Sequence, residues 1–116
     1  MPTEADVRRI ALSLPATTEK PSYGTAGFRV RDRLFARMRE EGDALVVFCG
    51  DLAEEEALLA LEPEVLFTTP HHDGHPTVLV RLDRIDEALL TELVTDSWRS
   101  RAPVRLRASF DADGPG

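Results

Sequence analysis

Apolar residues recur at helical spacing in three segments of the chain, and each segment is bounded by residues typical of helix ends. The first segment follows Thr3, a capping residue with Asp6 three positions on, and it stops before Pro15. Its apolar stripe consists of Val7, Ile10, Ala11 and Leu14. This pattern predicts an amphipathic helix that packs on a core.

The other two helices have similar boundaries. The second is predicted to begin at Asp51, with Glu54 at the capping-box position, and to end before Pro63. The third is predicted from about Asp86 to Arg101, with Pro103 ending or kinking it. The apolar face of the second consists of Ala57, Leu58 and Leu61. The wide stripe of the third consists of Leu89, Leu90, Leu93, Val94, Ser97 and Trp98.

Five further runs have the composition of β-strands, three before the second predicted helix and two after it, with short turn-like segments inside each group. They are residues 26–30, 34–39, 44–49, 65–69 and 77–82. Arg31, Asp32 and Arg33 form a short polar connection in the first hairpin, and Asp73-Gly74 marks a turn in the last. The element order is therefore α-β-β-β-α-β-β-α. Since tight turns make antiparallel pairs, the chain is predicted to be an α+β two-layer sandwich with an antiparallel sheet of about five strands.

Composition places the chain among ordinary soluble proteins. It has 116 residues, 42% of them apolar and 30% charged, which fits a single domain over 1–110 with a frayed tail at 111–116. The longest apolar run, Ala44 to Cys49, is far shorter than the ~20 residues of a membrane helix, so no membrane partner is expected. The N-terminal residues lack the pattern of a secretory signal, and a cytoplasmic location is expected. A single cysteine excludes an internal disulfide.

Charge is distributed unevenly along the chain. The net charge is −7, yet residues 26–39 contain five arginines and one acid, Asp32. A protein that binds nucleic acid through bulk charge is normally basic overall, so such a role requires a local patch. The candidate nucleic-acid-binding residues are Arg29, Arg31, Arg33, Arg37 and Arg39.

Strand alternation predicts how this hairpin presents its side chains if the connecting loop has three residues. One face holds Phe28, Val30, Leu34, Ala36 and Met38. The opposite face holds Arg29, Phe35, Arg37 and Arg39, with Arg31 and Arg33 at the tip. Guanidinium groups at these positions suit phosphates, and Phe35 suits stacking on a base or sealing a partner. One alternative is a solvated face whose arginines pair with Glu40, Glu41, Asp43 or acids of the second half of the chain. Another is an exposed face or edge that binds a protein partner or a second copy.

Other chemistry-bearing residues favour structural interpretations. His71, His72, Asp73 and His75 are a dense group of metal-ligand types, but adjacent histidines point apart and flanking prolines fit a rigid hairpin, so no metal is predicted. Cys49 is expected to be a buried, inert thiol, and Trp98 a core anchor. Tyr23 either closes a ligand pocket or caps the core, with Gly24 supplying an unusual φ. The acidic run is interpreted as a solvated face; it comprises Glu54, Glu55, Glu56, Glu62 and Glu64.

Several short motifs, taken in order, resemble the MmcQ/YjbR-like proteins over nearly the whole chain. They are Pro21-Ser22-Tyr23-Gly24-Thr25, Phe28-Arg29-Val30, Leu34-Phe35-Ala36-Arg37, Phe67-Thr68-Thr69-Pro70-His71, Val78-Leu79-Val80-Arg81-Leu82, Trp98 and Ala102-Pro103. The resemblance implies a secretion-chaperone-like sandwich, also compared with the frataxin-like fold, and a DNA-binding role assigned to the family largely by structural analogy. It implies no catalytic residue and no cofactor. Many members have Gly-Trp where this chain has Pro76-Thr77, so an aromatic residue in that loop is absent.

These observations lead to one preferred function and two alternatives. We expect a non-enzymatic DNA-binding protein that uses the arginine hairpin. The first alternative is a protein-interaction or homodimerisation module. The second is a small-molecule pocket near Tyr23 and the histidine turn.

Overall fold

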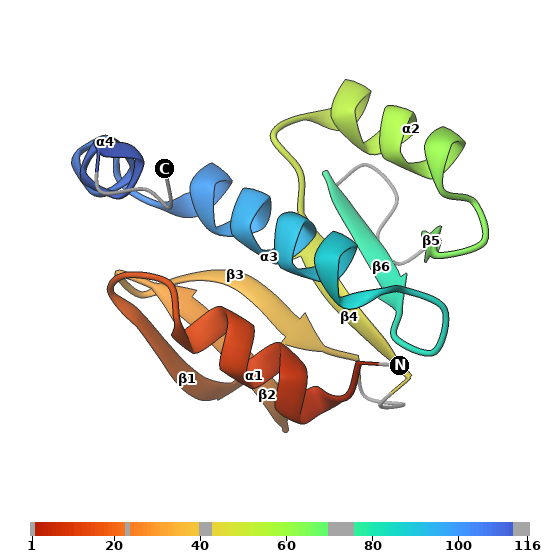
Figure 1. Ribbon diagram of the computed structural model, residues 1–116, viewed down its shortest axis with the longest axis horizontal. Helices are drawn as coiled ribbons and strands as arrows, with labels where there is room; N and C mark the ends of the chain where they lie inside the picture. Colours follow the sequence, from red (N-terminus) through yellow and green to blue (C-terminus); the bar gives the residue numbers. More distant parts are fainter. Residues whose placement is uncertain (1, 23, 40–42, 70–75, 113–116) are drawn as a thin grey trace.

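A single antiparallel sheet, covered on one face by helices, forms the body of the protein (Figure 1). The computed structural model describes residues 2–22, 24–39, 43–69 and 76–112. In chain order the elements are α1 (Glu4–Leu12), β1 (Thr17–Ser22), β2 (Thr25–Val30), β3 (Arg33–Met38), β4 (Ala44–Phe48), α2 (Leu52–Leu61), β5 (Leu66–Phe67), β6 (Thr77–Arg81), α3 (Glu87–Arg101) and α4 (Val104–Ala112). The sheet order is β1-β2-β3-β4-β6-β5. The predicted α+β class and antiparallel sheet are confirmed.

Two elements were not predicted from the sequence. Strand β1 pairs only with β2, at the edge of the sheet, and consists of Thr-Thr-Glu-Lys-Pro-Ser, without the apolar alternation that identifies a half-buried strand. Its Lys20 and Pro21 are typical of an edge strand that resists pairing with another chain. Helix α4 begins just after Pro103. The proline therefore ends α3, as predicted, and the chain then resumes a helix in a new direction (Figure 1).

The predicted helix caps form where the sequence places them. Thr3 and Asp6 make a capping box, in which the Asp6 carboxylate accepts a hydrogen bond from the Thr3 N–H at 2.9 Å. This bond, ahead of contacts with Arg9, lowers the pKa of Asp6 below its usual value. Asp51 caps α2, but the Glu54 carboxylate accepts from the N–H of Gly50 at 3.0 Å and not from Asp51.

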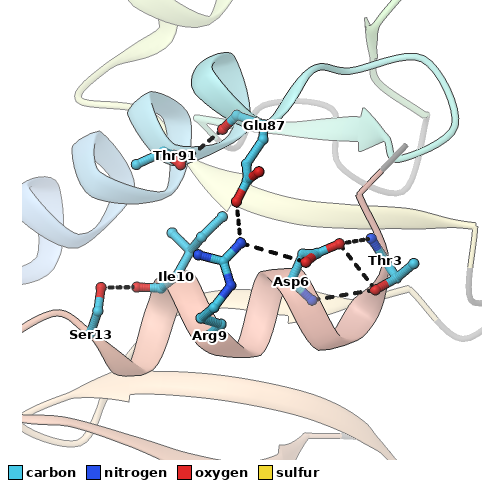
Figure 2. A network of polar contacts seen from close by, with 7 residues as sticks. All are labelled: Thr3, Asp6, Arg9, Ile10, Ser13, Glu87 and Thr91. Carbon is cyan, nitrogen blue, oxygen red and sulfur yellow. Dashed lines mark hydrogen bonds and ion pairs between the residues drawn. The ribbon is translucent and has the colours of Figure 1, made fainter.

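Helix α1 is tied to the start of α3 by a polar network on the helical layer (Figure 2). The Arg9 guanidinium lies 3.5 Å from Asp6 on its own helix and donates to Glu87 of α3. Both helices place their apolar residues in the main core, so the network fixes their relative position above the sheet.

The main core lies between the sheet and helices α1 and α3. Its largest fully buried side chains include Trp98, Phe28, Phe35, Met38, Leu45 and Leu90. Trp98 is 0% exposed and its indole N–H donates to the Pro15 carbonyl at 3.0 Å, which confirms the predicted anchor. Leu61 was predicted to face the core but is 74% exposed, because α2 packs beside β5 and β6 through Leu58 and Leu59 instead.

Strands β3 and β4 separate at one end, and α3 fills the opening. Their pairing runs through Met38↔Leu45, Arg37↔Val46 and Ala36↔Val47, so Phe35 and Phe48 would form the next pair. Instead the buried Ser97 hydroxyl accepts from the Phe48 N–H at 2.8 Å and donates to the Phe35 carbonyl. A side chain from α3 thus replaces one rung of the β-ladder.

Candidate nucleic-acid interface

The arginine hairpin formed by β2 and β3 turns through two residues, Arg31 and Asp32. Both lie in the left-handed region, with φ of 49° and 69°. Two residues of positive φ match the right-handed twist of a hairpin, although glycine and asparagine fill such turns more readily. The predicted three-residue loop is therefore wrong, because Arg33 already pairs with Val30.

A β-bulge changes the faces predicted for this hairpin. The register shifts between Phe28, which pairs with Ala36, and Arg29, which pairs with Leu34, so Phe35 is the extra residue. A bulge lets two successive side chains lie on the same side of a strand. Phe35 accordingly joins Ala36 in the core at 0% exposed, while the partly buried Leu34 takes its place beside Arg29. The expectation that Phe35 stacks on a base or seals a partner is wrong.

The five candidate arginines fall into two groups along the hairpin. Arg31 and Arg33 are exposed at the turn, and the Arg29 guanidinium donates to the Asp32 carbonyl at 3.2 Å. Arg37 and Arg39 are partly buried near the other end of β3, and both interact with protein groups. At about 3.3 Å per residue, Arg33 and Arg39 lie ~20 Å apart along the strand.

The second group belongs to a cluster on the sheet face opposite the main core. Arg39 lies 3.8 Å from the Asp43 carboxylate, and its guanidinium carbon is 5.6 Å from the centre of the Phe67 ring. Arg81 lies against the same ring at 4.2 Å. Under these side chains lie the buried residues Ala44, Val46 and Leu79. Arg39 therefore already makes structural contacts with Asp43 and Phe67.

The turn group has no such neutralisation. Among the residues with described positions, no carboxylate forms an ion pair with Arg29, Arg31 or Arg33. The Asp32 side chain is 88% exposed and lies 3.8 Å from Lys20. Three guanidinium groups thus stand near one turn with their charges available to an anion.

Helix α3 brings a second arginine-rich segment to the same end of the molecule. Residues 97–110 contain four arginines and no acid, a run that is visible in the sequence and from which no site was predicted. Arg101 donates through Nε to the Leu34 carbonyl at 3.0 Å, next to the β2–β3 turn. Figure 1 shows α4 beyond this end of α3. Exposed Arg105 and partly buried Arg107 lie on α4.

The charges that surround Arg101 and Cys49 have opposite signs. Burial lowers the pKa of Arg101, and the nearby positive charge of Arg33 lowers it further. Around the start of α2 the neighbouring charges are negative. Burial raises the pKa of the Cys49 thiol to about 12, and the charges of Glu54, Glu55 and Asp51 also raise it. The positive charge of Arg33 therefore acts on Arg101, and the negative charges of Asp51, Glu54 and Glu55 act on the Cys49 thiol.

The remaining candidates add little chemistry. Cys49 is buried, as predicted. Tyr23, His71, His72, Asp73 and His75 lie outside the described residues, as do Glu40 and Glu41. Gly24 has a φ of 81°, in line with the unusual φ expected there. In the described ranges, no helix is long and apolar enough to span a membrane, and no three metal-ligand side chains converge.

An open hollow of about 420 Å³ lies near the predicted small-molecule segment. It is lined by Glu4, Arg8, Glu19, Pro21, Gly24, Thr25 and Ala26. Its cation, Arg8, is paired with Glu19 at 2.7 Å and with Glu4 at 3.3 Å. These ion pairs neutralise the positive charge that a small anionic ligand would need for binding.

Comparisons with known proteins agree on one family and one fold. A family model described as YjbR matches residues 12–100. "Uncharacterized protein Rv2570" of Mycobacterium tuberculosis and "Uncharacterized protein Mb2600" of Mycobacterium bovis are each 38% identical to the chain, covering 97% of it and 98% of their own length. The crystal structure of Deinococcus radiodurans protein DR2400, with family-model domain DUF419, is similar in fold with a TM-score of 0.69 at 23% identity. That match covers 84% of this chain and 77% of the other.

Proposed function

The chain belongs to the YjbR family, and from this premise we propose that it binds the phosphate backbone of nucleic acid through the β2–β3 arginines. Arg29, Arg31 and Arg33 make the first contacts at the turn. Arg37 and Arg39 flank them along β3. One observation carries the proposal: the three turn guanidiniums have no ion-paired carboxylate among the described side chains.

The geometry favours backbone contacts over base recognition. Arginine forks suit phosphate oxygens, and such contacts position a protein on nucleic acid without reading its sequence. Burial of Phe35 removes the aromatic residue of the hairpin that was expected to stack on a base. The ~20 Å between Arg33 and Arg39 corresponds to about six base pairs of duplex at 3.4 Å each. Binding is therefore expected to be weak, independent of sequence and strongly weakened by salt.

The alternative module for protein interaction or self-association has less support. It required Phe35 or another apolar residue at an exposed interface; Phe35 is 0% exposed, which leaves residues such as Leu61 and Val104, 74% and 71% exposed on two different helices. One of the two edge strands of the sheet, β1, carries Lys20 and Pro21, which disfavour pairing with a second chain.

Fluorescence anisotropy with a labelled 20-base-pair duplex, at about 50 mM salt and above, tests the proposal. We expect measurable binding whose logarithmic salt slope reflects ~0.9 per phosphate contact. The variant R29A/R31A/R33A should lose binding and keep its unfolding temperature. Arg84→Ala removes an exposed arginine from the loop between β6 and α3 and serves as the matched control. An unbound duplex at ~50 mM salt, or equal affinity in the triple variant and the control, would overturn the proposal.

A further inference from the structure

Arg101 is held in place on two sides near the hairpin turn. Its Nε donates to the Leu34 carbonyl at 3.0 Å, and its guanidinium carbon lies 4.6 Å from the centre of the Phe48 ring. The side chain is partly buried. Within the described part of the chain, its two terminal amino groups have no hydrogen-bond acceptor and no ion-paired carboxylate. The planar fork is therefore oriented in advance, with two donors available.

Arg33 directly precedes Leu34, whose carbonyl accepts from Arg101, and among the described residues no carboxylate forms an ion pair with Arg33. Arg33 is exposed at the start of β3, and its positive charge helps to lower the pKa of Arg101. Two like charges held together, one of them partly desolvated, repel each other unless an anion lies between them. A tetrahedral oxyanion presents several acceptors to such a pair, which suits charge-assisted hydrogen bonds.

The fold itself creates this arrangement. Ser97 holds β3 and β4 apart, and Arg101 lies one helical turn further along α3, where it reaches the Leu34 carbonyl. The following helix adds two more arginines at the same end. One of them, Arg107, has a buried Nε with no acceptor among the described residues.

We propose that Arg101 and Arg33 together bind one phosphate group of the nucleic-acid backbone, at the junction of α3 with the β2–β3 turn. This inference rests on the proposed function. It adds Arg101 to the site, a residue 67 positions along the chain from Leu34, whose carbonyl orients it. Arg101 supplies the fixed fork, and Arg33 supplies the exposed charge. The same chemistry would suit free inorganic phosphate, so the experiment must separate the two sources.

The test compares Arg101→Gln with Arg99→Gln in the duplex-binding assay. Arg99 lies on the same helix but is already paired with Asp111 at 2.5 Å, so its loss should leave binding unchanged. We expect Arg101→Gln to bind about tenfold more weakly at 50 mM salt and its salt slope to fall by ~0.9, the share of one phosphate contact. Arg101→Lys keeps the charge but loses the fork, so it should keep most of the slope and still bind more weakly.

Arg33→Gln provides a second variant in case Arg101→Gln is unstable, because the exposed Arg33 side chain forms no ion pair within the described residues. It should also weaken binding, and the double variant should lose less than the sum of the two losses, because both residues hold one phosphate. Additive losses, or an Arg101→Gln slope equal to that of Arg99→Gln, would overturn this inference while leaving the hairpin function standing. Failure of the wild-type chain to bind the duplex would overturn both.

Inorganic phosphate is tested separately by following the Arg101 Nε–H resonance by NMR. A response at low millimolar phosphate, together with unchanged duplex binding in Arg101→Gln, would assign the site to free phosphate and overturn the backbone proposal. A duplex-induced shift of this resonance, absent in Arg33→Gln, supports it.

Discussion

Replacing Ser97 with alanine removes the hydroxyl that bridges β3 and β4. In the wild-type protein this hydroxyl satisfies the Phe48 N–H and the Phe35 carbonyl, in a place where Ser97 is 0% exposed. Arg39 and Ala44, four residue pairs along the two strands, are joined directly by a backbone hydrogen bond at 2.9 Å. Because hydrogen-bonded pairs alternate along antiparallel strands, Phe35 and Phe48 fall on a position that should be bonded directly. The variant leaves both groups unpaired.

The expected cost follows from those two groups. An unsatisfied buried donor or acceptor costs about 1–3 kcal/mol, and the Phe48 end is only partly buried, so we expect a combined loss of about 2–4 kcal/mol. Alanine recovers a few tenths of a kcal/mol through its higher helix propensity. For a domain of this size the unfolding temperature should fall by roughly 4 °C per kcal/mol, which gives about 8–15 °C.

Thermal and urea unfolding followed by circular dichroism measure this loss, with Ser100→Ala as the control. The Ser100 hydroxyl donates only to the Ser97 carbonyl of its own helix, at 2.7 Å, so its removal should change stability by less than about 0.5 kcal/mol. A loss in Ser97→Ala no greater than in Ser100→Ala would mean that β3 and β4 can close and pair directly. The argument that α3 holds the strands apart would then be refuted.

Three further outcomes are expected. Ala16 has a φ of 53°, so Ala16→Gly should raise the free energy of unfolding by about 0.5–1 kcal/mol in urea titrations; a loss would show that the backbone strain is absent. The pKa of the Cys49 thiol is raised to about 12, chiefly by burial, so the thiol should resist thiol reagents at pH 8 in the folded protein; rapid labelling would contradict this. The free energy of unfolding should fall as pH rises from about 9 towards 12, since only the unfolded thiol ionises in that range. Asp32→Asn tolerates the φ of 69° and removes the acid of the turn, so duplex affinity at 50 mM salt should rise about threefold; unchanged affinity would exclude the turn from the interface.

Local sequence signals predicted the elements that depend on local chemistry. Thr3, Asp51 and Pro103 mark helix ends by their own hydrogen-bonding or steric properties, and the structure uses them in that way. Strand β1 has no such signal, because an edge strand pairs on one side only and need not alternate.

The candidate site was predictable in composition but not in geometry. The segment from Arg33 to Met38 contains three consecutive apolar residues, Leu34, Phe35 and Ala36, so polarity alone does not assign Phe35 to a face. The bulge that turns Phe35 inward depends on how the neighbouring strand pairs. Arg101 lies in a run of residues without acidic side chains, which is visible in the sequence. Its contact with Leu34 spans 67 residues and exists only once α3 enters the gap between two strands.

The positions of helix α2 and the β2–β3 turn affect how neighbouring copies would bind along one nucleic acid. In a copy whose β2–β3 turn faces the nucleic acid, helix α2, which carries Glu54, Glu55 and Glu56, lies farther from it (Figure 1). Neighbouring copies would then present like charges to one another within a Debye length of about 10 Å at 0.1 M salt. We therefore expect copies to bind non-cooperatively along the nucleic acid, with gaps between them.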